Sequence, residues 1–81
     1  MNIYVANISY NTSDEDIKDL FTEYGEVAFA KIIKDRDSGR SKGFGFVEMP
    51  NDEHAKSAIE GLDGREVDGR PLKVNVARDR K

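Results

Sequence analysis

The sequence contains no cysteine and no tryptophan, and it has a single histidine, His54. Without cysteine the chain can form no disulfide and no thiolate metal site, and a cysteine nucleophile is excluded. One histidine also leaves few ligands for a transition metal. No stretch approaches the roughly 18 apolar residues of a membrane-spanning helix, and the N-terminus lacks a signal-peptide pattern. We therefore expect a soluble, cytoplasmic protein with no cofactor, no metal ion and no membrane partner.

A chain of 81 residues can close only one hydrophobic core. We expect residues 1–77 to form one domain and residues 78–81 to form a short basic tail. The net charge of −3 is unevenly distributed. Residues 13–26 hold six acids and one lysine, whereas residues 70–81 hold five bases and one acid. This pattern predicts a polarised molecule with acidic helices and a basic remainder.

Apolar periodicity and capping signals predict six elements in the order βαββαβ. Ser13 and Asp16 have the spacing of a capping box, and Asn51 is a suitable N-cap for a second helix. The predicted strands cover residues 3–6, 27–34, 43–49 and 72–76, and the helices cover about 13–24 and 51–62. We predict an α+β, ferredoxin-like sandwich with a four-stranded antiparallel sheet and both helices on one face.

The third predicted strand contains two phenylalanines that alternate with glycines. Period-two alternation places Lys42, Phe44, Phe46 and Glu48 on one face and residues 43, 45, 47 and 49 on the other. The charged residues mark the first set as the solvent face, because an unpaired buried charge is expensive. The glycines are then expected to keep the helix-side surface close-packed.

The first strand is expected to contribute a third ring to the same face. Ile3 and Val5 suit the core, so Tyr4 points outward beside Asn2 and Ala6. The topology places the first and third strands at the centre of the sheet. Three aromatic rings should therefore lie together on an uncovered surface. The opposite arrangement, with both phenylalanines in the core, would bury the charges of the third strand.

These two strands resemble a known pair of motifs. Residues 3–8 (IYVANI) resemble the hexamer, and residues 42–49 (KGFGFVEM) the octamer, of the RNA recognition motif, in particular its small single-domain bacterial members. The resemblance implies that Tyr4 and Phe46 stack on successive bases and that Phe44 packs against a sugar or base. It also implies a short hairpin at residues 65–70. The remaining RNA-binding candidates are Asn2, Lys31, Arg40, Lys42, Lys73, Asn75, Ala77, Arg78 and Arg80.

The sequence leaves the orientation of Phe29 open, and it assigns no binding role to the acidic run at residues 14–16 or to His54. Phe29 alternates with Lys31, which would put its ring on the open face, but Val27 would then need a bulge or bend to reach the core. The face of Phe29 is left undecided. The acidic run at residues 14–16 is better explained by the helix dipole than by a bound cation, and His54 is expected to be a surface residue.

The predicted function is a non-catalytic, monomeric module that binds about two to four nucleotides of single-stranded RNA, with single-stranded DNA as an open alternative and no small-molecule substrate. The acidic net charge predicts few phosphate contacts and a shallow salt dependence. A protein–protein interaction module that uses the same aromatic face or the acidic helices is the alternative function. An acylphosphatase-like enzyme would need an arginine in the loop after the first strand, and residues 9–12 contain none.

Overall fold

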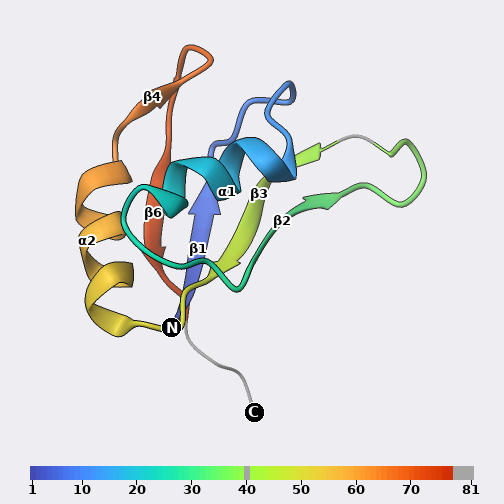
Figure 1. The fold of residues 1–81 in the computed structure, drawn as a ribbon. Helices are drawn as coiled ribbons and strands as arrows, with labels where there is room; N and C mark the ends of the chain where they lie inside the picture. The colour runs from blue at the N-terminus through green and yellow to red at the C-terminus, as the bar shows by residue number, and fades with distance from the viewer. Residues whose placement is uncertain (40, 78–81) are drawn as a thin grey trace.

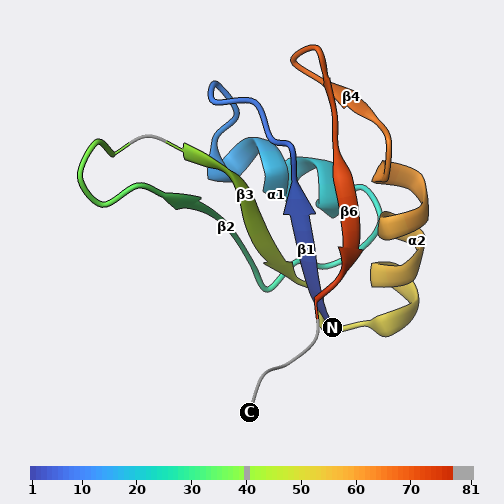
Figure 2. The same ribbon diagram turned by 180° about the vertical axis from the view of Figure 1, so that it is seen from behind.

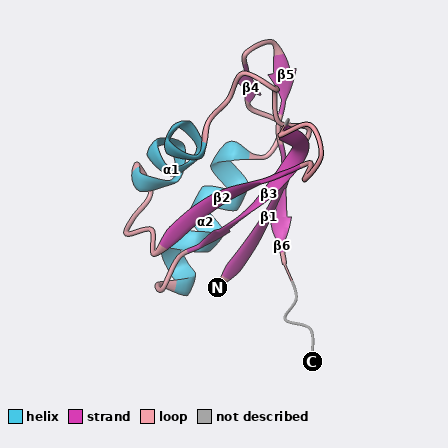
Figure 3. Ribbon diagram, turned by 90° about the vertical axis from the view of Figure 1, so that its right-hand side faces the viewer, coloured by secondary structure: helices cyan, strands magenta, loops and turns pink. Residues whose placement is uncertain are grey.

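The computed structural model describes residues 1–39 and 41–77. A four-stranded antiparallel sheet has the order β2-β3-β1-β6, with a separate two-stranded hairpin, β4-β5 (Figure 1). Both helices lie on one side of the sheet (Figure 3), and the view from behind shows the strands uncovered (Figure 2). The elements are β1 (Asn2–Ala6), α1 (Asp14–Thr22), β2 (Phe29–Lys34), β3 (Ser41–Glu48), α2 (Asp52–Leu62), β4 (Glu66–Val67), β5 (Arg70–Pro71) and β6 (Lys73–Val76). The predicted fold is confirmed.

Both helices begin at the predicted caps. The Ser13 hydroxyl accepts a hydrogen bond from the Asp16 N–H, and the Asp16 carboxylate accepts one from the Ser13 N–H, which completes the capping box. The Asn51 side chain accepts from the backbone N–H groups of Glu53 and His54. These bonds satisfy backbone donors that a helix N-terminus leaves unpaired. Within the described residues, neither helix is long and apolar enough to cross a membrane.

The hydrophobic core lies between the sheet and the two helices. Phe21 of α1 is its largest completely buried side chain, and Leu62 of α2 is also completely buried. In β1 buried and outward positions alternate, with Ile3 and Val5 buried, whereas β6 contributes Val74 alone and its Val76 is 52% exposed. The buried core residues are Ile3, Val5, Ile8, Ile17, Phe21, Ile32, Val47, Met49, Ala55, Ala58, Leu62, Leu72 and Val74.

Strand β2 differs most from its predicted form. It begins at Phe29, two residues later than predicted, and Val27 packs against the core from the segment before the strand. No bulge is therefore needed at Val27, and the register shift lies between Ile32 and Lys34 instead. A hydrogen bond connects the outer edge of β2 to α1: the Ile32 N–H donates to the Asp14 carboxylate at 2.8 Å.

Gly45 of β3 explains how closely β2 and β3 approach one another. It lies opposite Ile32, and a Cβ atom at Gly45 would collide with the Lys31 carbonyl oxygen and come within 2.9 Å of the Ile32 Cα atom. The expectation that this glycine serves helix packing is therefore wrong. Its missing side chain makes room for the backbone of the adjacent strand.

The hairpin implied for residues 65–70 is present as β4-β5. Asp68 and Gly69 form its turn with φ values of 52° and 81°. Positive φ at both central residues suits the twist of a two-residue hairpin, and Asp-Gly is a preferred pair for it. The hairpin contacts the loop between β1 and α1, since Asn7 Nδ2 donates to the Pro71 carbonyl oxygen at 2.7 Å.

Candidate nucleic-acid interface

Strand register brings three aromatic rings together at the centre of the uncovered face. Tyr4 of β1 lies opposite Phe46 of β3, and Ala6 lies opposite Phe44. The ring centroids are 5.6 Å apart for Tyr4 and Phe46, 6.0 Å for Tyr4 and Phe44, and 6.4 Å for the two phenylalanines. We call these three side chains the ring platform. The predicted cluster is confirmed, and it forms because β1 and β3 pair directly.

The ring platform is accessible from solvent. Phe46 is 37% exposed, and Tyr4 and Phe44 are half-buried. The residues that alternate with them, Val5 and Val47, are completely buried under the helices. The rings are tilted or edge-on to one another, and such pairs are mutually attractive. They form a supported aromatic surface whose outer side can receive another flat, apolar group.

Polar side chains border the ring platform on both sides. One cross-strand row runs Lys31, Phe46, Tyr4 and Asn75, and the next places Lys73 opposite Ala6. Lys31, Lys73 and Asn75 are exposed. The predicted candidates on β2 and β6 are thus brought beside the rings. They supply cations and a hydrogen-bonding amide, which are the groups that contact phosphates and base edges.

The register also decides the face of Phe29, which the sequence left open. Phe29 pairs with Glu48, and Lys31 with Phe46, so these four side chains share the uncovered face. Phe29 is 49% exposed. It extends the aromatic surface along β2. Glu48 is the acidic residue on this face, and Asn2 lies opposite it on β1.

Four of the candidates from the sequence are only partly described or fall outside the described residues. Arg40, Arg78 and Arg80 lie outside them, as does the side chain of Lys42, whose backbone belongs to β3. The N–H of Ala77 donates to the Asn2 carbonyl oxygen at 2.8 Å. A main-chain contact from Ala77 to RNA would therefore use its carbonyl oxygen.

A comparison with protein families bears on this geometry. The RNA recognition motif model matches residues 3–73, which include both helices, the whole of β3 and all of β1 except Asn2. This chain belongs to the RNA recognition motif family. The resemblance of the hexamer and octamer is thereby confirmed. RNA recognition motifs are binding modules without catalytic activity, so the prediction of a non-catalytic protein holds.

Individual relatives cover nearly the whole of this RNA recognition motif. The protein RbpF of the cyanobacterium Nostoc sp. strain PCC 7120 is 51% identical over 81 residues, which are 100% of this chain and 77% of RbpF. The crystal structure of RNA binding protein PG1 is 48% identical, with a TM-score of 0.95 and coverage of 100% of this chain and 98% of that one. The RNA15 RRM with bound RNA (GU) is 33% identical, with a TM-score of 0.86 and coverage of 96% and 83%.

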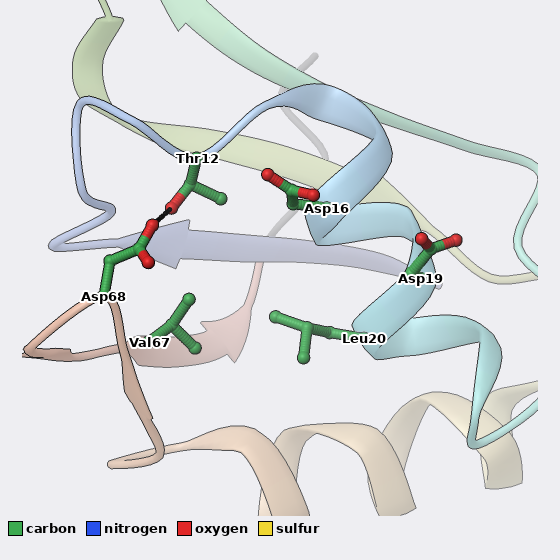
Figure 4. Close-up of a pocket in the computed structure, with 6 residues that line it drawn as sticks. All are labelled: Thr12, Asp16, Asp19, Leu20, Val67 and Asp68. Atoms are coloured by element: carbon green, nitrogen blue, oxygen red, sulfur yellow. Dashed lines mark hydrogen bonds between the residues drawn. The ribbon is translucent and has the colours of Figure 1, made fainter.

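The helix side of this RNA recognition motif has a small acidic hollow between α1 and the β4-β5 hairpin (Figure 4). Leu20 and Val67 form its apolar part. Asp68 accepts a hydrogen bond from the Thr12 hydroxyl at 3.0 Å, and Asp16 belongs to the capping box. These carboxylates have structural roles and would repel phosphate. His54 is exposed as predicted, and its ring lies against Gly25.

Sequence reasoning missed several tertiary contacts of this RNA recognition motif, including two made by α1 and the loop before it. One is the bond from the Ile32 N–H to Asp14, which gives the first acid of α1 a role beyond the helix dipole. The other joins the loop between β1 and α1 to strand β5, 60 residues away in sequence, because the Arg70 guanidinium carbon lies 5.6 Å from the centroid of the Tyr10 ring. Tyr10 is 68% exposed. Its position outside any apolar periodicity was the available signal.

Proposed function

We propose that this RNA recognition motif binds single-stranded RNA by stacking unpaired bases on the ring platform. The observation that carries the proposal is the contact of three rings, Tyr4, Phe44 and Phe46, on a sheet face that no helix covers. Stacking on an aromatic side chain is worth about 1–3 kcal/mol per base, and it tolerates any base because every base has a flat face. The RNA15 RRM, a similar domain, was solved with bound RNA (GU), which favours RNA over a peptide as the occupant.

The proposed roles follow the positions of the side chains. Tyr4 and Phe46 stack on successive bases, and Phe44 packs against a sugar or base. Polar groups beside the rings, namely Asn2, Lys31, Lys73 and Asn75, contact phosphates and base edges. The resemblance adds Arg40, Lys42, Arg78, Arg80 and the main chain of Ala77 as further contacts. Phe29 offers a further apolar contact on β2. The platform and its border accommodate about two to four nucleotides.

We further propose that residues 1–77 act as one monomeric domain in the cytoplasm, with no small-molecule substrate. Single-stranded DNA would stack on the same rings, since base stacking does not require the ribose 2′-hydroxyl. Parallel titrations with RNA and DNA tetramers of the same base compare the two ligands. Sedimentation equilibrium of the free protein and its complex measures the oligomeric state.

The proposal is tested by titrating ¹⁵N-labelled protein with tetramers of uridylate, adenylate and cytidylate. We expect amide shifts concentrated in β1 and β3, where the rings lie. Shifts confined to α1 and α2, or no shifts with any oligomer, would defeat the proposal.

A matched pair of tyrosine variants sharpens that test. Tyr4→Ala should weaken binding by about 1–3 kcal/mol, because it removes one stacking surface. Tyr24→Ala is the control, since Tyr24 packs on the helix side against Gly61 and the core. It should leave affinity unchanged while lowering the melting temperature. Equal losses of affinity in both variants would mean that Tyr4 acts only through stability.

A further inference from the structure

The loop between β1 and α1 holds an exposed aromatic ring beyond the end of the sheet. Tyr10 is 68% exposed, more than any other large hydrophobic residue among those described. Asn11, which follows it, is also exposed, but three other residues of the loop are buried: Ile8 is 0% exposed, Ser9 is 8% exposed and Thr12 is 4% exposed. The ring therefore projects from a loop that buried residues on both sides of it anchor in the protein.

Hydrogen bonds fix this loop from both sides. The Ile8 N–H donates to the Gly43 carbonyl oxygen at 2.9 Å, which joins the start of the loop to β3 beside Phe44. The Thr12 hydroxyl donates to Asp68 of the hairpin, and the Thr12 N–H donates to the Ser9 carbonyl oxygen. A binding group on such a loop loses little conformational entropy when a ligand arrives.

Arg70 of the hairpin holds the Tyr10 ring. Its guanidinium carbon lies 5.6 Å from the ring centroid, within the range of a cation–π contact. Arg70 thus covers the ring on one side and places a cation beside it. The loop between β1 and α1 and the β4-β5 hairpin lie at the same end of the molecule (Figures 1 and 2).

The pair also lies close to the ring platform. Ile8 is hydrogen-bonded to Gly43, which precedes Phe44 in β3. Tyr10 is two residues after Ile8, so their Cα atoms are at most about 7 Å apart. Lys73, three residues after Arg70, lies opposite Ala6 at the same end of the sheet. An RNA strand that leaves the ring platform past Phe44 and Lys73 would therefore meet Tyr10 and Arg70 next.

We propose that Tyr10 and Arg70 form an additional nucleotide site that extends the ring platform by one unpaired nucleotide of the same RNA strand. The base stacks on the side of the Tyr10 ring that Arg70 does not cover, and the Arg70 guanidinium contacts the adjoining phosphate. This site rests on the proposed function, because a strand bound on the sheet brings the extra nucleotide to the loop.

The test compares short and long oligomers by isothermal titration calorimetry. Oligouridylates, oligoadenylates and oligocytidylates of four and seven nucleotides are titrated into wild type, Tyr10→Ala, Tyr10→Phe and Arg70→Gln. With tetramers, Tyr10→Ala should bind within about twofold of wild type, because the sheet alone accommodates them. With heptamers it should bind about 5- to 150-fold more weakly than wild type. Tyr10→Phe should retain wild-type affinity, and Arg70→Gln should lose part of it.

Two controls separate this site from the sheet and from the fold. A heptamer can bind in more registers than a tetramer, and this raises its apparent affinity for every variant. The informative quantity is therefore the dissociation constant of Tyr10→Ala divided by that of wild type, taken at each oligomer length. Phe46→Ala should lower the affinity for tetramers and for heptamers by the same factor. The Tyr10 ring resonances in an aromatic ¹H–¹³C spectrum should shift with heptamers and stay in place with tetramers.

The possible failures are distinguishable. If wild type binds tetramers but Tyr10→Ala matches it on heptamers, the additional site is wrong and the ring platform stands. A Tyr10→Ala variant that melts earlier yet keeps heptamer affinity also overturns the additional site, with Tyr10 serving only the loop. If wild type binds no oligomer of either length, the proposed function and the additional site both fail.

Discussion

The two faces of the sheet are built from the same strands but from different kinds of side chain. On the helix side Ile3, Val5 and Val47 are completely buried. On the open side the alternating positions carry Tyr4 and Phe46, whose rings reach solvent. Adjacent residues of one strand therefore serve stability and binding separately. A substitution at a buried position should lower the free energy of unfolding and leave RNA affinity unchanged, and a substitution at the adjacent exposed position should do the reverse.

Charge is divided between the faces in the same way. The acids of the helices lie on the covered side, and two of them are engaged in structure: Asp14 with the Ile32 N–H and Asp16 in the capping box. The open face carries exposed Lys31 and Lys73 beside the rings, with Glu48 as its acidic member. A net charge of −3 is thus compatible with an anionic ligand, because much of the negative charge lies away from the proposed site.

Phe21→Ala should produce the largest effect, and it tests the covered face. The side chain is completely buried in α1, so its removal leaves a cavity and should lower the free energy of unfolding by about 3–5 kcal/mol. Urea denaturation followed by circular dichroism measures the change. Phe29→Ala is the matched control, because Phe29 is 49% exposed. A similar loss in both variants would contradict the division between the faces.

Gly45→Ala tests the close approach of β2 and β3. The added methyl group would collide with the Lys31 carbonyl oxygen, so the strands must separate, and we expect a loss of about 1–3 kcal/mol in stability. Thermal and urea unfolding measure that loss, and amide shifts should concentrate in β2. A variant as stable as the parent would show that β2 relaxes without cost.

Asp14→Ala tests the tie between α1 and the edge of β2. The variant leaves the partly buried Ile32 N–H without its acceptor and should lower stability by about 1–2 kcal/mol. Asp14→Asn retains an acceptor oxygen and should lose less. Glu15→Ala, at the next and exposed position, is the control. If all three variants unfold at the same urea concentration, the Asp14 contact contributes nothing measurable.

Lys73→Gln and Glu48→Gln should have the smallest effects, of opposite sign. Loss of a phosphate contact at Lys73 should weaken RNA binding and reduce the slope of log affinity against log salt by about 0.7. Glu48→Gln removes a negative charge from the same face and should strengthen binding slightly at low salt. Titrations at three salt concentrations measure both. If the slope of log affinity against log salt is the same for Lys73→Gln and wild type, Lys73 does not contact a phosphate.

Alternation and local signals were sufficient to predict the central part of the molecule. The charges at positions 42 and 48 identified the solvent face of the third strand, and with it the outward direction of Phe44 and Phe46. The capping residues Ser13 and Asn51 were equally readable, because a helix N-terminus depends on side chains a few residues away. These features are local, and sequence spacing describes them fully.

Features that depend on tertiary contacts could not be predicted. The face of Phe29 depends on where β2 starts and on its register with β3, which alternation within β2 leaves undecided. Gly45 was assigned to helix packing, but its neighbour is the backbone of β2. The contact between Tyr10 and Arg70 joins the β1–α1 loop to the β4-β5 hairpin, which only the folded chain brings together. In each case the deciding partner is distant in sequence.

The central claim is that neighbouring residues of β3 divide stability and RNA binding between them. Its most direct test measures unfolding free energy and affinity for one RNA tetramer in Phe46→Ala and Val47→Ala. We predict that Phe46→Ala loses about 1–3 kcal/mol of affinity with little change in stability, and that Val47→Ala loses about 1.5–3 kcal/mol of stability with little change in affinity. Full RNA affinity in a folded Phe46→Ala variant would contradict the account.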